Sequence, residues 1–148
     1  FGNKIFDHYT YVFAGDGCLM EGLSHESASL AGHLKLNKLI VFFDDNKISI
    51  DGSTNLATSI NQLDRFKSCQ WDVQSIDGHD FGSIEKAIFK AKQNSQPSLI
   101  SCKTIIGYGS PNKSGKASSH GAPLGDDELI LVRNNPDAPT RQPLTISA

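Results

Sequence analysis

Two short segments carry the residue types best suited to chemistry: Gly15-Asp16-Gly17, and Asn46 within the run FFDDNKIS. Each follows an apolar stretch that is typical of a strand, YTYVFA before the first segment and LIVFF before the second. Carboxylate and amide oxygens are ligands that Mg²⁺ or Ca²⁺ accepts, and phosphate oxygens can complete the coordination shell. Glycine lets the backbone approach a ligand, and the start of a helix presents unpaired N–H groups to an anion. The two segments therefore predict a site for a divalent cation and a diphosphate.

The elements that must position these residues are short apolar strands alternating with helices. The strands are expected at Tyr9–Ala14, Leu39–Phe43, Trp71–Ile76 and Leu99–Ile106. Helices are expected at Leu19–Leu34, at Gln62–Ser68, and along the stripe Ile84, Ala87, Ile88 and Ala91, with Asp80 or Ser83 as the cap. In the first helix, Leu23, Leu30, Ala31 and Leu34 recur at helical spacing, and Gly32 is a weak point. This alternation predicts an α/β fold in which a parallel sheet is flanked by helices on both faces.

Two regions do not fit regular structure. The stretch 107–125 is rich in Gly, Ser and Pro, and it follows the carboxyl end of a predicted strand, the edge where open α/β sheets bind ligands. A stretch of this length inside a compact unit is usually functional or disordered. The segment Asn134–Ala148 has three prolines and no periodicity, so it is interpreted as an extended tail.

Composition limits the classes of function. The 148 residues carry a net charge of -2 with 20% charged residues, so neither a nucleic-acid-binding surface nor a disordered acidic or basic chain is indicated. No apolar run reaches the length needed to cross a membrane. Cys18, Cys69 and Cys102 form no CxxC pair, which favours reduced thiols and a cytoplasmic location. Because the first residue is Phe1, we expect a piece of a longer chain.

Longer strings of sequence indicate a family. GDGCLMEGLSHE, LAGHLKLNKLIVFFDDNKISIDG, CKTIIGYGSPNKSG and SSHGAPLG occur in this order, and between Asp7 and Arg133 the chain resembles a transketolase. The resemblance lies in the domain that binds the diphosphate of thiamine diphosphate. It implies a partial diphosphate-binding domain over residues 1–133, followed by a divergent tail over residues 134–148.

The resemblance also implies a metal site with three protein ligands. These ligands would be the side chains of Asp16 and Asn46 and the backbone carbonyl of Ile48, and the ion would be Mg²⁺ or Ca²⁺. Gly15 and Gly17 match glycines that lie beside the cofactor diphosphate. One carboxylate, one neutral amide and one carbonyl would leave the cation enough charge to offset two phosphates.

Further cofactor-binding residues follow from the same resemblance. Ile50 and Ile106 match apolar residues near the thiazolium ring, where they would exclude water. His120 matches a catalytic histidine that approaches the diphosphate and the donor substrate. Glu21 matches an acidic residue near the dimer interface that is linked to cofactor binding, and Lys103 lies where some members place a lysine near the diphosphate.

By this resemblance, the complete protein would transfer a two-carbon ketol unit from a ketose phosphate to an aldose phosphate in the pentose phosphate pathway. The active site would form in a homodimer, where a second subunit supplies a pyrimidine-binding domain whose glutamate activates the cofactor. That domain has no counterpart in these 148 residues, so the chain is expected to be inactive alone. The alternatives are a dihydroxyacetone synthase, a deoxyxylulose-phosphate synthase, or a truncated binding module without catalysis.

Simpler interpretations of single residues stay open at this point. Asp16 between glycines also suits a turn or a helix cap. Asp44 and Asp45 are rival metal ligands, although alternation along the strand turns one of them away. His120 could be a solvated surface histidine.

Overall fold

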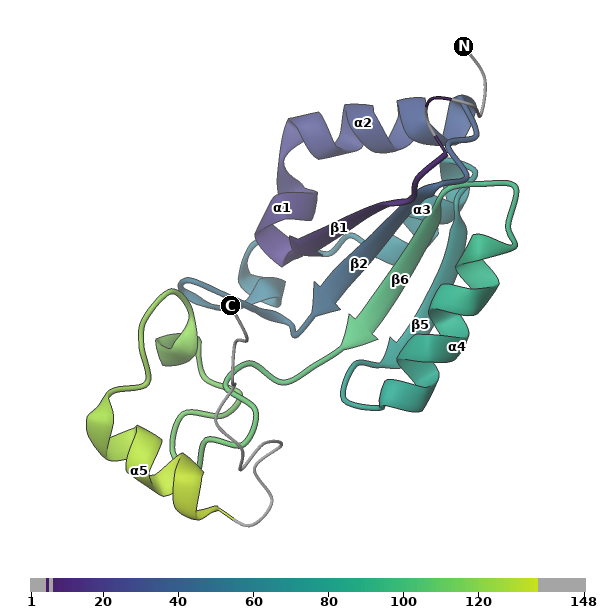
Figure 1. Cartoon of the computed structure of the whole chain (residues 1–148). Helices are drawn as coiled ribbons and strands as arrows, with labels where there is room; N and C mark the ends of the chain where they lie inside the picture. Colours follow the sequence, from purple (N-terminus) through teal and green to yellow (C-terminus); the bar gives the residue numbers. More distant parts are fainter. Residues whose placement is uncertain (1–4, 6, 136–148) are drawn as a thin grey trace. The chain divides into compact units, whose positions relative to one another are not determined.

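The computed structural model describes residue 5 and residues 7–135, which form two compact units. The first unit comprises the described residues up to 47 and residues 54–104, and the second comprises residues 48–53 and those from 105 onward. The first unit is built on four parallel strands in the order β1-β2-β6-β5 (Figure 1). Their bounds are β1 (Thr10–Gly15), β2 (Leu39–Asp45), β5 (Asp72–Asp77) and β6 (Ser98–Lys103). The predicted parallel α/β architecture is confirmed.

Strand register brings the predicted site residues to one edge of this sheet. Gly15 at the end of β1 is the register partner of Asp44, and Asp45 at the end of β2 is the partner of Lys103. Because all of the strands are parallel, their carboxyl ends meet at the same edge. The strand predicted to run to Ile106 ends at Lys103 instead, where β2 also ends and no longer offers a pairing partner.

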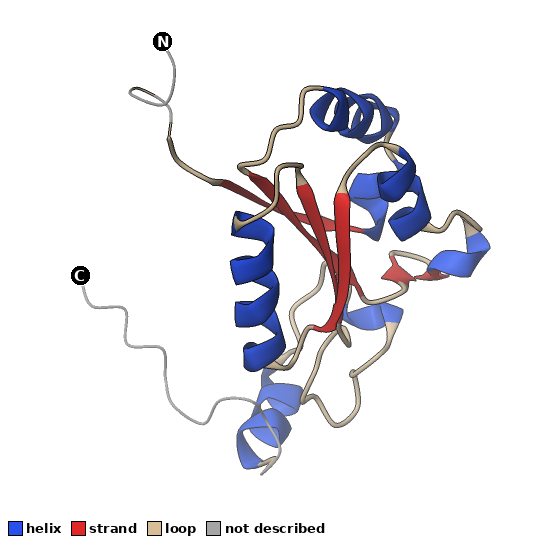
Figure 2. Ribbon diagram, turned by 90° about the vertical axis from the view of Figure 1, so that its right-hand side faces the viewer, coloured by secondary structure: helices blue, strands red, loops and turns tan. Residues whose placement is uncertain are grey.

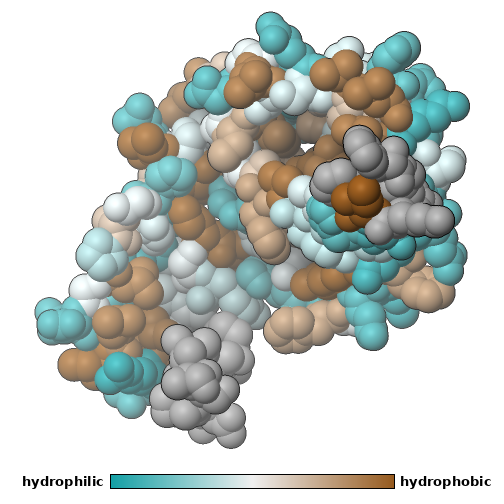
Figure 3. All heavy atoms as spheres, turned by 45° about the horizontal axis from the view of Figure 1, so that its top comes forward, coloured by the Kyte–Doolittle hydropathy of each residue, from teal (hydrophilic) through white to brown (hydrophobic). Residues whose placement is uncertain are grey.

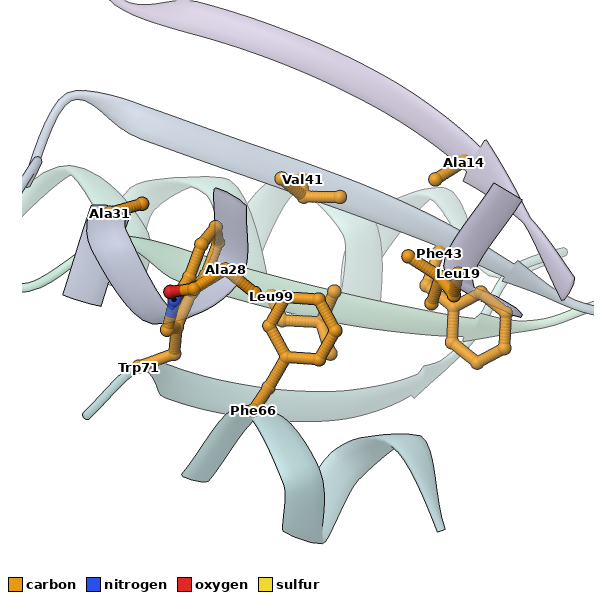
Figure 4. Packing of buried hydrophobic residues seen from close by; sticks show 9 residues of the cluster. All are labelled: Ala14, Leu19, Ala28, Ala31, Val41, Phe43, Phe66, Trp71 and Leu99. Atoms are coloured by element: carbon orange, nitrogen blue, oxygen red, sulfur yellow. Dashed lines mark hydrogen bonds between the residues drawn. The ribbon is translucent and has the colours of Figure 1, made fainter. Parts of the chain in front are cut away.

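Helices cover both faces of the sheet, as Figure 2 shows with the sheet seen nearly edge-on. One face packs against α1 (Asp16–Met20), α2 (Gly22–His33) and α3 (Gln62–Ser68), and the other packs against α4 (Phe81–Lys92). The first core contains Ala14, Leu19, Ala28, Ala31, Val41, Phe43, Phe66, Trp71 and Leu99 (Figure 4). The second contains Ile40, Phe42, Ala87, Ala91 and Ile100. Alternate residues of the buried strands thus supply both cores, as expected for a parallel sheet covered on each side.

The helix predicted at Leu19–Leu34 is two helices, α1 and α2, which meet at Glu21 in extended conformation. The expected leucine face is wrong, because Leu23, Leu30 and Leu34 are 75%, 57% and 55% exposed. The side of α2 that faces the core carries Ala28, Ala31 and Gly32 instead. Small residues are required there because the helix lies in direct contact with the backbone that follows α3, at Gly32.

Two other elements agree closely with prediction. Helix α3 has the predicted bounds, and the Asn61 side chain caps it by accepting from the backbone N–H of Leu63 and Asp64. Helix α4 begins after Asp80, whose carboxylate accepts from the N–H of Gly82. The cap satisfies a donor that the first turn would otherwise leave unpaired, so Asp80 is the confirmed choice over Ser83.

The remaining elements are short. The first unit also contains the 3₁₀ turn η2 (Thr54–Leu56). In the second unit, β3 (Ile48–Ser49) and β4 (Gly52–Ser53) form an antiparallel hairpin, and η3 (Ala117–Ser119) interrupts the loop before α5 (Asp126–Asn134). Helix α5 was not predicted, although its acidic first turn is a recognised start signal. It includes Asn134, and the predicted tail from residue 136 onward lies outside the described residues.

Within residue 5 and residues 7–135, no helix is long and apolar enough to cross a membrane. On the face seen in Figure 3, hydrophobic residues are interspersed with hydrophilic ones.

Candidate metal and diphosphate site

Asp16 is the first residue of α1, directly after β1, and its side chain is buried at 8% exposure. The carboxylate accepts a hydrogen bond from the backbone N–H of Lys47. Its Oδ2 is buried and has no hydrogen-bond partner among the described residues. A buried anionic oxygen without a partner is costly, so this atom is a strong candidate for a ligand of a cation.

The pKa of Asp16 is raised above its usual value for two main reasons. Burial is the larger cause, and the neighbouring charge of Asp45 adds to it, whereas Lys47 acts in the opposite direction. Both causes penalise the ionised form in the metal-free protein. A divalent cation at Oδ2 would supply positive charge at the atom that needs it.

Asn46 follows the end of β2, and its side-chain Nδ2 donates to Oδ2 of Asp44 at 3.0 Å. This bond involves the amide nitrogen, so the amide oxygen, which a cation would require, lies on the other branch of the side chain. Asp44 is itself held by the hydroxyl of Thr104, which donates to its Oδ1. The two bonds connect the loops that follow β2 and β6, so the fold orients the predicted amide ligand.

Asp45 lies on the opposite face of β2 from Asp44, as strand alternation predicts. Asp44 is exposed, whereas Asp45 is only 6% exposed. Its Oδ2 accepts from the Ser101 hydroxyl at 3.0 Å, and its Oδ1 lies 2.5 Å from the Lys47 ammonium. Asp45 is therefore already compensated by a cation of the protein, whereas Oδ2 of Asp16 is not.

Sequence reasoning missed Lys47, although this residue contacts both buried carboxylates. Its backbone adopts a left-handed conformation with φ of 63°, which lysine rarely takes, so no local signal marks the turn. Ser101 was also missed. It is the register partner of Phe43 on β6, and only the pairing of the strands reveals that it faces Asp45.

A hollow of about 440 Å³ lies beside this cluster in the first unit. Its lining includes Asp16, Asp45, Lys47, Thr54 and Lys103. Mixed hydroxyl, carboxylate and ammonium groups suit a cation with a polar or anionic ligand. A larger hollow of about 1000 Å³, beside α4, is lined mainly by aromatic and aliphatic side chains and does not suit a diphosphate.

Four other predicted cofactor-binding residues belong to the first unit: Gly15, Gly17, Glu21 and Lys103. A Cβ atom added at Gly15 or Gly17 would meet nothing within 4 Å, so packing in this chain does not require glycine at either position. That open space is compatible with the predicted approach of a diphosphate. Lys103 ends β6 and lines the hollow, whereas Glu21 is exposed at the junction of α1 and α2.

The other predicted residues belong to the second unit, which is described by itself. Ile48 pairs with Ser53 in the hairpin, and Ile50 at its tip is 75% exposed. The carbonyl of Ile106 accepts from the N–H of Gly115 at 2.8 Å, and His120 is exposed directly after η3. The approach of these residues to Asp16 stays a prediction.

The ligand types available near Asp16 limit the kind of metal site that could form there. Nowhere in the described part of the chain do three or more His, Cys, Asp or Glu residues gather in a way that could hold a metal ion. A cation site here would therefore need amide and carbonyl oxygens beside the Asp16 carboxylate, which is the combination predicted from the sequence. Such oxygen ligands suit Mg²⁺ or Ca²⁺ and leave coordination positions for phosphate oxygens.

Open parallel sheets of α/β domains bind their ligands at the carboxyl ends of the strands, and in this chain that edge carries Oδ2 of Asp16, which is buried without a partner among the described residues. The fold and the site thus define an α/β ligand-binding domain. The family described as "Transketolase, thiamine diphosphate binding domain" matches residues 1–148, and the chain belongs to this family. The cofactor that this family binds is thiamine diphosphate.

Curated relatives agree with this assignment. The chain is 57% identical over 134 residues to transketolase 1 of Escherichia coli, a match that covers 89% of the chain and 20% of that protein. It is 55% identical over 133 residues to a transketolase of Sinorhizobium medicae, covering 90% of the chain and 19% of that protein. The chain thus spans about a fifth of the length of these relatives.

Solved structures show the same fold. A transketolase of Campylobacter jejuni superposes with a TM-score of 0.87 at 42% identity, over 90% of this chain and 21% of that chain. A Pichia stipitis transketolase in complex with sedoheptulose 7-phosphate gives a TM-score of 0.82 at 48% identity, over 85% of this chain and 19% of that chain.

Proposed function

We propose that this chain supplies the metal and diphosphate anchor of a transketolase, which transfers a two-carbon ketol unit from a ketose phosphate to an aldose phosphate. The observation that carries the proposal is Oδ2 of Asp16, a buried carboxylate oxygen without a partner among the described residues, at the carboxyl edge of the sheet. Membership of the transketolase thiamine diphosphate binding family supports the choice of cofactor.

In this proposal, each residue has a limited task. Asp16, the Asn46 side-chain oxygen and the Ile48 carbonyl would hold the cation, and Lys47 would keep the Asp16 carboxylate in place through its backbone N–H. Thiamine diphosphate supplies the electron sink for cleavage of the bond beside the ketose carbonyl. The protein orients that cofactor and excludes water from it.

The residues of the second unit would act on the reacting end of the cofactor. Ile50 and Ile106 would form an apolar wall that excludes water near the thiazolium ring. His120 would donate a hydrogen bond to the diphosphate or to the donor sugar. In the first unit, Glu21 would contribute at the dimer interface and Lys103 beside the diphosphate.

The proposal extends to the assembled enzyme. A pyrimidine-binding domain from a second subunit would complete each active site in a homodimer, and sugar phosphates would be the substrates. Free Cys18, Cys69 and Cys102 support a reducing compartment, and we propose the cytoplasm and the pentose phosphate pathway.

Calorimetric titration of thiamine diphosphate in the presence of Mg²⁺ tests the anchor. We expect Asp16→Ala to weaken binding at least about tenfold, which corresponds to the loss of one charge-assisted contact. Asp77→Asn is the matched control, because Asp77 also ends a strand of this sheet and its exposed carboxylate accepts from the backbone N–H of His79. Equal affinity for the parent and the Asp16→Ala variant would refute the assignment.

A further inference from the structure

We propose that Glu128 is a positioning residue: it fixes the loop of residues 105–125 and thereby sets the place of His120. The inference rests on the proposed function, in which His120 contacts the cofactor or the donor sugar. Glu128 lies in the first turn of α5 and is only 7% exposed. Its two neighbours in the same turn, Asp126 and Asp127, are exposed.

Three donors from the loop converge on the Glu128 carboxylate. The Ser110 hydroxyl donates to Oε1, which also accepts from the backbone N–H of Asn112 at 2.8 Å. Oε2 accepts from Nδ2 of Asn112 at 3.0 Å. These hydrogen bonds, with that of Ser110 first, lower the pKa of Glu128 to about 2, so the group is ionised throughout the physiological range.

Further hydrogen bonds carry this fixation along the loop toward the histidine. Ser110 Oγ, while donating to the carboxylate, accepts from the backbone N–H of Lys113 at 3.1 Å. The carbonyl of Lys113 in turn accepts from the Ser119 hydroxyl at 2.6 Å. His120 follows directly and is held by its own N–H, which donates to the carbonyl of Ala117 at 2.8 Å. Hydrogen bonds thus link the buried carboxylate, through Ser110 and the backbone of Lys113, to Ser119, the residue before the histidine.

The same network holds the start of the loop. The N–H of Gly115 donates to the carbonyl of Ile106 at 2.8 Å. Gly107 adopts a φ of 64°, and a Cβ there would lie 3.0 Å from the Ser119 hydroxyl and 3.1 Å from the Lys113 carbonyl. The loop is therefore folded closely on itself, so a shift at the carboxylate would be felt at both Ile106 and His120.

A carboxylate is the only side-chain group that fits this place. Each donor that reaches Glu128 requires an acceptor, and an ionised carboxylate is acceptor-only at both oxygens. Glutamine has the same size but would direct an NH₂ group at one of these donors. Glu128→Gln therefore removes the charge and turns at least one of the three hydrogen bonds into a contact between two donors, while it preserves the volume of the side chain.

Hydrogen exchange on the full-length gene product tests whether Glu128 holds the loop. We expect Glu128→Gln to increase the exchange rates of loop amides, such as those of Asn112, Lys113 and Gly115, by about tenfold or more. The control, Asp127→Asn, replaces an exposed carboxylate of the same helical turn and should leave these rates unchanged. Unchanged protection in Glu128→Gln would overturn the proposal.

A double-mutant cycle with His120→Ala tests whether Glu128 acts through the histidine. Glu128→Gln alone should raise the KM for the ketose donor more than it lowers kcat, and in the His120→Ala background its further effect should be less than about twofold. A purely structural role would give independent, multiplicative losses, which would overturn the positioning role. If His120→Ala alone leaves kcat/KM unchanged, the role of His120 in the proposed function is refuted and the positioning role falls with it, whatever the exchange experiment says of the loop.

Discussion

Gly32 allows a sharp test of how α2 packs in the first unit, because two effects of opposite sign compete there. In an exposed helix, Gly→Ala is stabilising by about 1 kcal/mol, since alanine loses less conformational freedom on folding. At Gly32, however, an added Cβ would lie 1.7 Å from the carbonyl oxygen of Cys69 and 2.9 Å from its carbonyl carbon. To reach even 3.0 Å from that oxygen, one of the two segments must move by at least 1.3 Å, the difference between 3.0 and 1.7 Å.

The Cys69 backbone cannot move freely. Its N–H donates to the carbonyl of Arg65 at 3.2 Å, and the N–H of Trp71 donates to that of Phe66 at 3.2 Å. The indole Nε1 of Trp71 also donates to the carbonyl of Ala28 in α2 at 2.8 Å, across the contact that must open (Figure 4). Overpacking costs about 1–3 kcal/mol and a strained hydrogen bond about 1 kcal/mol, so after the helical gain we expect Gly32→Ala to lower stability by about 2 kcal/mol.

Urea denaturation followed by fluorescence measures this effect, because Trp71 is the single tryptophan of the chain and lies at the contact. The control is Gly22→Ala at the start of the same helix, where an added Cβ meets nothing within 4 Å and stability should hold or rise. A Gly32→Ala variant as stable as the parent, with an unchanged dependence on urea, would refute the packing described for α2.

Three further predictions concern stability. Trp71→Phe should lower the free energy of unfolding by about 1–3 kcal/mol, as measured by circular dichroism, because the buried carbonyl of Ala28 loses its indole donor; no loss would contradict that bond. The folded pKa of Glu128, about 2, lies below its ordinary value of 4.5, so its contribution is complete above about pH 4.5 and is lost as the pH falls toward 2. Glu128→Gln should therefore flatten the acid-denaturation profile in that window, and an unchanged slope would count against it. Asp16→Asn should raise the stability of the metal-free protein at neutral pH, because burial raises the pKa of Asp16 and so penalises its ionised form. The same substitution should abolish the stability that Mg²⁺ adds in thermal melts, and retention of the Mg²⁺ effect would contradict the metal role.

The sequence by itself predicted those features of the fold that depend on local signals. The continuous apolar run Leu39–Phe43, which is short and ends at a turn signal, favours a strand buried on both faces of a sheet, and the predicted parallel sheet flanked by helices is confirmed. Asp16 and Asn46 directly follow β1 and β2, and this position places them at the carboxyl edge, since the ends of parallel strands lie at the same edge of the sheet. The Asp80 cap and the bounds of α3 follow from equally local signals.

The tertiary structure decided what depends on contacts between distant residues. The sequence pattern of α2 favours its leucines as the buried face, but close approach to Cys69 selects the alanines and Gly32, and no periodicity within the helix encodes that distance. Likewise, Asp16 and Asp45 are both acidic residues at strand ends, yet only the fold gives Asp45 the ammonium of Lys47 and leaves Oδ2 of Asp16 buried without a partner among the described residues. Residue type and spacing therefore predicted a cation site at this edge, whereas burial and charge compensation in the folded chain distinguish Asp16 from Asp45 as the carboxylate suited to bind a cation.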